Sequence, residues 1–428
     1  MMNKPTFKII TLGCKVNAFE SEEYAEELVK RGFQKTEEKA EVYLVNTCAV
    51  TNIAAGKCRQ RIHAIRRDNP EALIAAIGCY VQLCRDDLSV FSDCQVIIGT
   101  HDKEKVGEKI AEAYRNKTEY IAVSEKNETV LHNQEIEHFF LTRAYLKIQD
   151  GCNQFCTYCT IPLARGRERS LPYDQAIAQA KKLISPQHQE LVLTGIHTGR
   201  WQDGNKRLSD LIRGLLTEIP ELKRLRLSSI EMNEVTPEII EIMASEPRFA
   251  HHLHIPLQSA SDQILKQMHR PYTFSEYKAK LEYIKSKIPN VSISCDIIVG
   301  FPGETQEIFE EVKNNLIQLP LSFYHIFPYS IRNNTVAAAL PGQLDGKTKS
   351  ARVRELTILS ARSYNNYQST RLNQEAIVYV ESKQGEYWFG HSSDYLPVYF
   401  VSETDVYGQF VPVKITKTVQ RKVFGERI

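Results

Sequence analysis

The sequence predicts an α/β protein in three parts: an N-terminal parallel α/β domain, a central barrel-like parallel sheet and a small C-terminal all-β barrel. Short apolar segments alternate with helical patterns over residues 6–100, and six further strand–helix units follow from residue 144. Such alternation indicates parallel sheets. Beyond residue 371 only short strand-like segments remain, a pattern typical of the small barrels that often bind oligonucleotides.

In the first domain, four short apolar segments are expected to be strands. Ser21 is a good N-cap and Gly32 a good C-terminal stop, so we expect a helix between them that ends at Arg31. Residues 111–138 are polar and weakly periodic, and we interpret them as a linker. The expected strands are 7–11, 42–45, 73–77 and 96–98, and a second helix is expected at 54–67.

The central part repeats a strand–helix unit six times, which predicts a barrel-like parallel sheet, complete or open. In such sheets the chemistry lies at the carboxyl ends of the strands. The expected strands are 144–148, 191–194, 224–227, 252–255, 292–298 and 322–327, and the expected helices are 173–184, 208–218, 237–244, 262–286 and 305–319.

The C-terminal part follows a helix expected at 348–371. Four short strands are then predicted, at 376–380, 387–390, 396–400 and 410–415. The predicted division is an N-terminal domain at 1–115, a linker at 116–138, a central domain at 139–370 and a β-barrel domain at 371–428.

Three cysteines, Cys152, Cys156 and Cys159, stand together after the first strand of the central part. Three thiolates can hold three irons of a [4Fe–4S] cube and leave the fourth iron open to a small molecule. A zinc site would need a fourth ligand nearby, and His188 and His197 lack metal-like spacing. A structural zinc site and a chance cluster of buried cysteines are the alternatives to this interpretation.

Another trio lies earlier in the chain, in the N-terminal domain; in chain order it is the first trio, and Cys152, Cys156 and Cys159 are the second. Cys14, Cys48 and Cys79 each follow an expected strand, about one strand–helix unit apart. In a parallel sheet such positions meet at one edge, so the three thiols are expected to converge. Gly13 and Gly78 would allow tight turns beside an inorganic group. The alternative is three unrelated loop cysteines.

Composition limits the cell compartment that we expect and the use of the cysteines. The chain has 428 residues, a net charge of +2 and ten cysteines, and no apolar run reaches the roughly 18 residues of a membrane span. No signal-peptide core precedes the first strand, so we expect a cytoplasmic protein without membrane contact. Its cysteines are then expected to be metal ligands, reactive thiols or small core residues and not disulfides. The cysteines interpreted as small apolar residues are Cys58, Cys84, Cys94 and Cys295.

The motifs resemble those of the radical S-adenosylmethionine (SAM) methylthiotransferases over essentially the whole chain. This resemblance implies a partial (βα)6 radical SAM barrel in the centre and an RNA-binding TRAM domain, similar to an OB-fold, at the end. The segments that carry it are 151–159, Ile161-Pro162, Arg165-Gly166, Arg169-Ser170, 254–259 and 296–305.

A shorter segment bears on the substrate. Residues 11–17, Thr-Leu-Gly-Cys-Lys-Val-Asn, resemble the enzymes that modify threonylcarbamoyladenosine, and residues 226–231 agree. Isopentenyladenosine enzymes tend to have Gln-Met-Asn after that cysteine, and enzymes that modify ribosomal protein S12 tend to have Pro-Lys-Asn. The implied function is methylthiolation of C2 of N6-threonylcarbamoyladenosine next to the anticodon of tRNA. The alternatives are isopentenyladenosine tRNA, a ribosomal-protein aspartate, or an RNA-binding iron–sulfur protein without radical chemistry.

The resemblance also implies the cofactors and partners. Cys152, Cys156 and Cys159 would hold a [4Fe–4S] cluster that binds SAM, and Cys14, Cys48 and Cys79 an auxiliary [4Fe–4S] cluster that carries sulfur. Two SAM molecules would be used per turnover, one cleaved to a 5′-deoxyadenosyl radical and one as methyl donor. The expected partners are tRNA, an electron donor such as flavodoxin or ferredoxin, and a sulfur source.

Further site residues are expected from strand ends together with the pattern of the family that the chain resembles, and from local charge. The candidate SAM contacts are Tyr158, Gly195, Ser228, Gln258 and Asp296. The candidate RNA contacts are basic residues in three groups, with a solvated helix face as the alternative for the first group. These groups are Lys57, Arg59, Arg61, Arg66 and Arg67; Arg165, Arg167 and Arg169; and Lys414, Lys417, Arg421 and Lys422.

Overall fold

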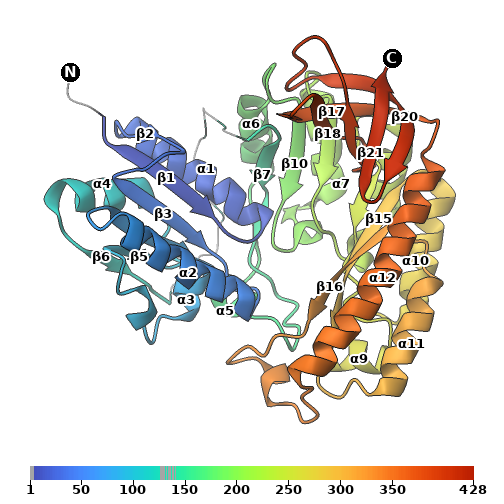
Figure 1. The fold of residues 1–428 in the computed structure, drawn as a ribbon, viewed down its shortest axis with the longest axis horizontal. Helices are drawn as coiled ribbons and strands as arrows, with labels where there is room; N and C mark the ends of the chain where they lie inside the picture. Colours follow the sequence, from blue (N-terminus) through green and yellow to red (C-terminus); the bar gives the residue numbers. More distant parts are fainter. Residues whose placement is uncertain (1–3, 126–130, 132, 134–135, 137–138, 140) are drawn as a thin grey trace. The chain divides into compact units, whose positions relative to one another are not determined.

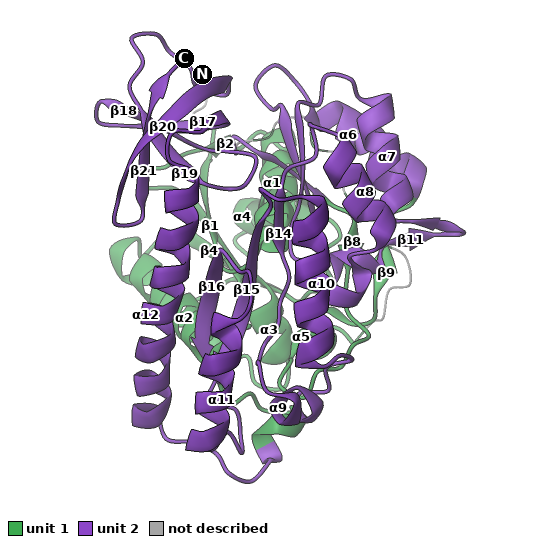
Figure 2. Cartoon of the chain, turned by 90° about the vertical axis from the view of Figure 1, so that its right-hand side faces the viewer, with its two compact units in different colours: residues 1–140, 147–172, 330–338 green, residues 141–146, 173–329, 339–428 purple. Residues whose placement is uncertain are grey.

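The computed structural model describes residues 4–125, 131, 133, 136, 139 and 141–428, and Figure 1 shows the course of the chain. Two structural units, coloured separately in Figure 2, make up the chain. The segment that carries the second cysteine trio groups with the N-terminal residues, so all six predicted ligands belong to unit 1. Unit 1 comprises Met1–Phe140, Lys147–Pro172 and Ser330–Ala338, and unit 2 comprises Leu141–Leu146, Tyr173–Tyr329 and Ala339–Ile428.

Unit 1 is built on a parallel sheet with strand order β2-β1-β3-β4-β5-β6. Helices cover both faces, because alternate residues of each strand are buried on opposite sides: Val42 and Leu44 of β3 pack with α1 and α4, and Tyr43 and Val45 pack with α2. The strands are β1 Thr6–Thr11, β2 Gln34–Lys35, β3 Val42–Thr47, β4 Leu73–Gly78, β5 Val96–Ile98 and β6 Tyr120–Ala122, and the helices are α1 Lys15–Lys30, α2 Asn52–Asp68, α3 Cys79–Leu83, η1 Ser89–Phe91 and α4 Val106–Asn116.

Two expectations for this unit are wrong. The first helix begins at Lys15, directly after Cys14, and Ser21 lies inside it. The Ser21 hydroxyl is buried and bonds Thr11 and Asn46, so it joins the helix to the sheet and does not cap it. The predicted linker also begins too early, because α4 runs to Asn116 and Tyr120–Ala122 adds a strand to the sheet. Part of the predicted linker lies outside the described residues.

A short antiparallel pair brackets the second cysteine trio in unit 1. Gln149 of β8 pairs with Ser170 of β9, and Asp150 pairs with Arg169. The loop between the two strands therefore starts and ends at one place, with a single helical turn near its end. The elements are β8 Gln149–Asp150, α5 Ile161–Arg165 and β9 Arg169–Ser170.

Unit 2 contains the strands predicted for the central part, in two sheets of order β13-β10-β7 and β14-β15-β16. Parallel bridges from Leu225 to Phe249 and from Ser229 to His254 connect the two sheets, so six strands form one open, barrel-like series. The strands are β7 Ala144–Lys147, β10 Glu190–Thr194, β13 Arg224–Leu227, β14 His252–His254, β15 Ser292–Val299 and β16 Phe323–Pro328, and a hairpin of β11 Gln202–Asp203 and β12 Lys206–Arg207 is added.

The helices of unit 2 follow the predicted pattern with one difference. The helix expected at 262–286 is two helices, because His269 adopts a left-handed conformation (φ 62°) and Pro271 cannot continue a helix. Thr273 then caps the second of them. The helices are α6 Tyr173–Leu183, η2 Thr198–Arg200, α7 Leu208–Glu218, η3 Met232–Glu234, α8 Pro237–Ser245, α9 Asp262–Gln267, α10 Phe274–Lys287, α11 Gln306–Ile317, η4 Val336–Ala339 and α12 Gly346–Thr370.

The C-terminal segment forms the predicted barrel, closed by five strands in the order β17-β18-β19-β21-β20. Its core is aliphatic and aromatic, with Val378, Val398, Phe400 and Val413 fully buried. Closure leaves the barrel without an open edge strand. The strands are β17 Glu375–Gln384, β18 Tyr387–His391, β19 Pro397–Phe400, β20 Phe410–Val419 and β21 Lys422–Arg427.

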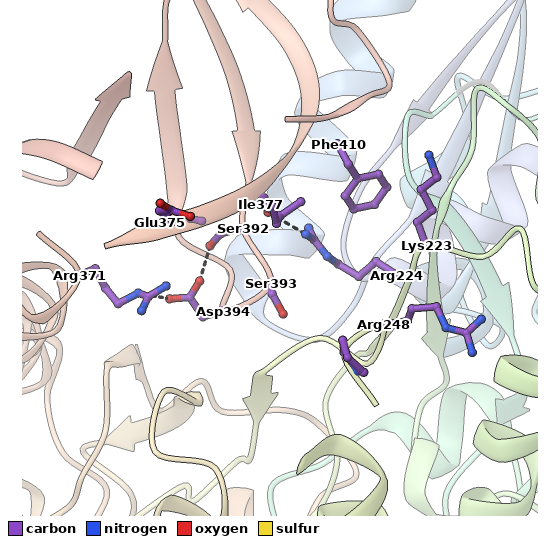
Figure 3. A pocket seen from close by; sticks show the side chains of 12 residues that line it. Lys223, Arg224, Arg248, Arg371, Glu375, Ile377, Ser392, Ser393, Asp394 and Phe410 are labelled. Carbon is purple, nitrogen blue, oxygen red and sulfur yellow. Dashed lines mark hydrogen bonds and ion pairs between the residues drawn. The ribbon is translucent and has the colours of Figure 1, made fainter. Parts of the chain in front are cut away.

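Two buried arginines of β13 attach this barrel to the parallel sheet within unit 2. Arg224 donates to the carbonyl oxygens of Ile377 (2.7 Å) and His391 (3.0 Å), and Figure 3 shows it reaching towards Ile377. Arg226 donates to those of Ser392 and Ser393, both at 3.0 Å. Both guanidinium groups also bond Glu190 of β10, at 3.2 Å from Arg224 and 2.8 Å from Arg226.

Glu190 is the anion on which this junction depends. Burial alone would raise the pKa of its carboxyl, but Arg226, Arg224 and Arg143 outweigh burial and lower the pKa to about 2. The carboxylate therefore stays charged at neutral and moderately acidic pH. Segment 226–231, which the sequence related to substrate type, thus begins with a residue that joins the barrel to the sheet.

Replacement of Arg226 by alanine should lower the free energy of unfolding by about 3–5 kcal/mol, because Glu190 stays buried with fewer partners. Urea unfolding checks this. Arg213→Ala, on the exposed face of α7, is the control and should cost less than about 0.5 kcal/mol. Because the pKa of Glu190 is lowered from 4.5, its contribution should be complete above about pH 4.5 and fall as the pH drops towards 2. Equal losses in both variants would contradict the role given to Glu190.

Candidate functional site

The first trio lies at one edge of the unit 1 sheet. Cys14 is the N-cap of α1 after β1, Cys48 directly follows β3, and Cys79 is the first residue of α3 after β4. The strands β1, β3 and β4 are neighbours and parallel, so the three residues leave the sheet at the same edge. Cys14 is exposed, and Cys48 and Cys79 are buried.

Two glycines allow the chain to approach this edge closely. Gly13 and Gly78 both have φ of 104°, a conformation that side-chain-bearing residues rarely adopt. A Cβ atom at Gly13 would lie 2.6 Å from the Cys48 sulfur, and one at Gly78 would lie 2.9 Å from the Asn46 amide oxygen. The backbone that carries Cys14 therefore lies directly against Cys48, and a side chain at position 13 would collide with the Cys48 sulfur.

The thiols of this trio influence one another. Burial, with smaller contributions from Cys79 and Cys14, raises the pKa of Cys48 to about 12. Burial likewise raises the pKa of Cys79, against the lowering effect of Arg165. A metal that binds these thiols as thiolates would therefore have to displace their protons.

Within the described residues, no three His, Cys, Asp or Glu side chains are arranged to hold a single metal ion. A cubic cluster makes a different demand, because each thiolate bonds a separate iron and the ligands stand further apart.

The second trio, Cys152, Cys156 and Cys159, lies half-buried in the loop between β8 and β9. Backbone N–H groups point at its sulfurs: that of Gln154 lies 3.4 Å from the Cys152 sulfur and that of Ile161 lies 3.4 Å from the Cys159 sulfur. Such donors stabilise thiolates and tune iron–sulfur clusters. The loop closes on itself at Gly151 (φ 72°), where a Cβ atom would lie 1.9 Å from the Arg167 carbonyl oxygen.

Arg165 connects the two trios within unit 1. Its side chain is 1% exposed and lies on α5, shortly after Cys159. Its guanidinium donates to the Cys79 sulfur (3.2 Å), to Glu20 (2.9 Å) and to Asp150 (3.0 Å). Arg165 also donates to the side-chain amide oxygen of Asn17, at 2.7 Å. These pairings lower the pKa of Glu20 well below its usual value, although burial opposes the shift.

This position corrects two of the expected RNA contacts. The guanidinium groups of Arg165 and Arg169 are buried, and both pair with Asp150, so neither is available to a phosphate. Arg167 between them is exposed and lies over the Phe155 ring, 4.6 Å from its centroid. Basic residues near the reactive loop look alike in sequence, and only the fold separates the buried from the exposed ones.

The other basic groups are mostly accessible. On α2, Lys57, Arg61 and Arg67 are exposed. Arg66 instead donates to the carbonyl oxygens of Ala72 and Asp93, so it serves the fold. Arg59 bonds the Tyr80 hydroxyl. In the C-terminal barrel all four candidates are exposed; they are Lys414, Lys417, Arg421 and Lys422.

Four of the expected SAM contacts lie on neighbouring strands of unit 2. Gly195 directly follows β10 and Ser228 directly follows β13. Gln258 has φ of 73°, and strained residues of this kind cluster at ligand sites; its N–H bonds the Asp296 carbonyl oxygen at 2.8 Å. Asp296 lies inside β15 and not at its end, with its carboxylate 3.2 Å from Nε2 of His254. Tyr158 is half-buried in the unit 1 cysteine loop.

A cavity of about 400 Å³ lies beside the barrel in unit 2, lined by Lys223, Arg224, Arg248 and Arg371 among others. Three of these cations already have anionic partners. Arg371 pairs with Asp394, as Figure 3 shows, Arg248 pairs with Glu246, and Arg224 pairs with Glu190. The cavity therefore offers an incoming anion much less positive charge than its residue types indicate.

Two features of the cysteine site were not predicted from the sequence: the acidic partners of Arg165 and a cavity. Glu20 is 1% exposed and pairs with Arg165, Lys147 and Lys103, yet nothing in its stretch of acidic residues distinguishes it. Asn17 had a signal, since it ends segment 11–17, which resembles the enzymes of one substrate type. The second cavity, about 370 Å³, lies wholly in unit 1 next to the cysteine loops and includes Arg332.

Comparison with known proteins gives consistent results. Residues 146–316 match the radical SAM superfamily, and residues 6–99 match the uncharacterized protein family UPF0004. Within the described residues, no helix combines the length and the apolar character needed to cross a bilayer. The radical SAM methyltransferase TsrM from Kitasatospora setae shares the fold, with a TM-score of 0.56 at 13% identity over 79% of this chain and 77% of that chain.

Sequence relatives are much closer. The threonylcarbamoyladenosine tRNA methylthiotransferase MtaB of Bacillus subtilis (strain 168) is 37% identical over 95% of this chain and 93% of its own. MtaB of Aquifex aeolicus (strain VF5) is 35% identical over 87% and 92%. A tRNA-2-methylthio-N(6)-dimethylallyladenosine synthase of Clostridium botulinum (strain Langeland) is 33% identical over 99% and 97%. This chain therefore belongs to the radical SAM tRNA methylthiotransferase family.

Proposed function

We propose that this enzyme adds a methylthio group to C2 of N6-threonylcarbamoyladenosine beside the anticodon of tRNA. The observation that carries the proposal is the presence of two cysteine trios in one structural unit of a chain that is 37% identical to an MtaB enzyme. The dimethylallyladenosine enzyme at 33% identity supports the second candidate, isopentenyladenosine tRNA.

The donor sets fit two [4Fe–4S] clusters. Each trio supplies three thiols, one too few for a cube, and N–H groups or Arg165 point at the sulfurs. When bound, the clusters and SAM supply a radical able to remove hydrogen from an unactivated C–H, together with the sulfur and the methyl group that replace it. Cys152, Cys156 and Cys159 would hold the SAM-binding cluster, and Cys14, Cys48 and Cys79 the auxiliary one.

The residues of this chain would bind and orient the cofactors and the substrate, and they would exclude water from them. Gly13 and Gly78 keep side chains away from the auxiliary trio, and Arg165 offsets negative charge on Cys79. We propose SAM contacts at Gly195 and Ser228, which follow strands, at Gln258, whose backbone is strained, and at the Asp296 carboxylate within β15. Tyr158 of the cysteine loop is a further proposed contact. An electron donor and a sulfur source would complete the turnover.

RNA binding is assigned to basic side chains that are exposed. The barrel group Lys414, Lys417, Arg421 and Lys422 meets this condition, as do Lys57, Arg61 and Arg67 of α2, together with Arg167. Phosphate contacts of this kind give affinity without sequence selection, and they weaken as salt rises.

Replacement of Cys152, Cys156 and Cys159 together by alanine should leave about half of the reconstituted iron, because the other trio lies on different elements and keeps its cluster. Iron and sulfide analysis of the anaerobically reconstituted protein measures this. Cys94→Ala, at a buried core thiol, is the control and should retain all the iron. Loss of all the iron, or of none, would exclude independent clusters.

Alanine at all four barrel cations, Lys414, Lys417, Arg421 and Lys422, should weaken tRNA binding and reduce its salt dependence by about one unit of slope for each phosphate that is no longer neutralised. SAM cleavage without tRNA should not change. Lys383→Ala, also exposed on β17, serves as the control for a single charge. Fluorescence anisotropy at several salt concentrations gives both quantities, and an unchanged salt slope would remove the barrel from the RNA interface.

The substrate is tested by competition between two anticodon stem-loops, one with threonylcarbamoyladenosine and one with isopentenyladenosine. The threonylcarbamoyl form should be methylthiolated preferentially, because a site built to pair a carboxylate leaves its own charges unpaired with an apolar group. Nucleoside mass spectrometry reads the products. Preference for the isopentenyl form would overturn the substrate assignment and leave the family unaffected.

A further inference from the structure

The 370 Å³ cavity of unit 1 is built from segments that immediately follow cluster ligands. Tyr80 is the residue after Cys79, Thr160 is the residue after Cys159, and Asn52 comes four residues after Cys48. The fourth wall is the 330–338 segment, including Arg332. A group in this cavity would therefore lie beside both cysteine trios, where a reacting nucleoside has to be held.

The 330–338 segment is fixed in place at both ends. Asn52 donates its backbone N–H to the Ser330 hydroxyl (3.1 Å) and its side-chain amide to the Ile331 carbonyl (2.9 Å). At the other end, the Ala337 N–H bonds the Thr157 carbonyl of the cysteine loop at 2.8 Å. Arg332 is thus carried by a segment joined to α2 and to the second trio.

Arg332 is a buried cation without an anionic partner in the part of the chain that the structure describes. The residue is 8% exposed, and its guanidinium bonds only the neutral amide oxygen of Asn52, at 2.7 Å. The second cation of the cavity, Arg59, bonds the neutral hydroxyl of Tyr80. None of the lining residues is acidic.

This lack of a counter-charge sets Arg332 apart from other buried arginines. Arg165 has Glu20 and Asp150, Arg226 has Glu190, and Arg352 has Glu304. A buried charge that is not neutralised costs stability, so the fold tolerates it where an incoming anion supplies the missing partner. The cavity is therefore an anion site that is complete only with its ligand.

The rest of the lining limits the shape of that ligand. The amides of Asn333 and Asn334 and the Thr160 hydroxyl can bond a carbonyl, an N–H or a hydroxyl group, and Leu83, Leu163 and Ile331 can pack against a methyl group. A phosphate would use the cations but not this apolar and amide surface. An amino-acid-like substituent with one carboxylate uses all of it.

We propose that this cavity receives the threonylcarbamoyl group of the substrate adenosine and that Arg332 pairs with its carboxylate, with Arg59 as a second cation. The inference rests on the proposed function and names the residues that would give it specificity. An isopentenyl group has no charge or hydrogen-bonding atom, so it would leave both guanidinium groups without an anion. The cavity would then favour the threonylcarbamoyl group by pairing with its carboxylate and disfavour the isopentenyl group by leaving the arginines without an anion.

The test uses two forms of one anticodon stem-loop, with the threonylcarbamoyl carboxylate free or converted to its primary amide. The holoenzyme should prefer the free carboxylate by about 10–100-fold in kcat/KM, the range expected for a hydrogen-bonded charge pair. Arg332→Met should lose this preference, with the loss falling on the free form. Arg332→Lys should recover part of it, because the charge returns without the planar fork.

Iron content should match wild type in both variants, and Arg332→Met should not lower the unfolding temperature, because it removes a buried charge that lacks an anionic partner among the described residues. Arg115→Met, at an exposed arginine of α4, is the matched control and should keep the full preference. If Arg332→Met still prefers the free carboxylate as wild type does, the cavity assignment is wrong while the proposed function stands. If wild type modifies neither form but does modify the isopentenyl stem-loop, the proposed function fails, and the cavity assignment fails with it.

Discussion

The buried guanidinium of Arg165 is the interaction on which the chemistry of unit 1 depends. It lies on the short helix after Cys159 and reaches Glu20, Asp150 and the Cys79 sulfur, so it binds a loop of one trio to a ligand of the other. Ions this deeply buried are tolerated only in near-ideal geometry, because desolvation of each is costly. The network therefore fixes the cysteine loop in one position against the N-terminal sheet, and removal of one partner would leave charges uncompensated.

The same rule organises unit 2. Glu190 neutralises Arg224 and Arg226, and both arginines use their remaining donors on carbonyl groups of the C-terminal segment. The barrel is thereby held to the sheet by charged hydrogen bonds and not by an apolar patch alone. The buried arginines Arg165, Arg224 and Arg226 are thus paired with anions, which sets Arg332 apart from them.

Periodicity and cysteine spacing predicted four strands of the unit 1 sheet, the six strands of the central part, a small barrel and the common edge of Cys14, Cys48 and Cys79, because these features depend on local patterns and on parallel topology. The short strands β2 and β6 and the last barrel strand β21 were not predicted. The start of α1 and the break at His269–Pro271 were missed, although Pro271 was a visible signal. Arg165 could not be distinguished from Arg167 by sequence, because its partner Glu20 stands 145 residues away. Pairings over such distances are set by the tertiary fold.

The overall sequence likeness does not decide between the two tRNA substrates, since relatives of both kinds are about one-third identical to this chain over most of its length. Those substrates differ in charge, and charge is what we propose the unit 1 cavity discriminates. An apolar substituent gains little from an apolar pocket and is rejected weakly by size, whereas two unpaired guanidinium groups reject it strongly. Because Arg332 is buried among neutral groups beside both trios, the same desolvation that makes it costly in the free enzyme makes a carboxylate the ligand that relieves that cost.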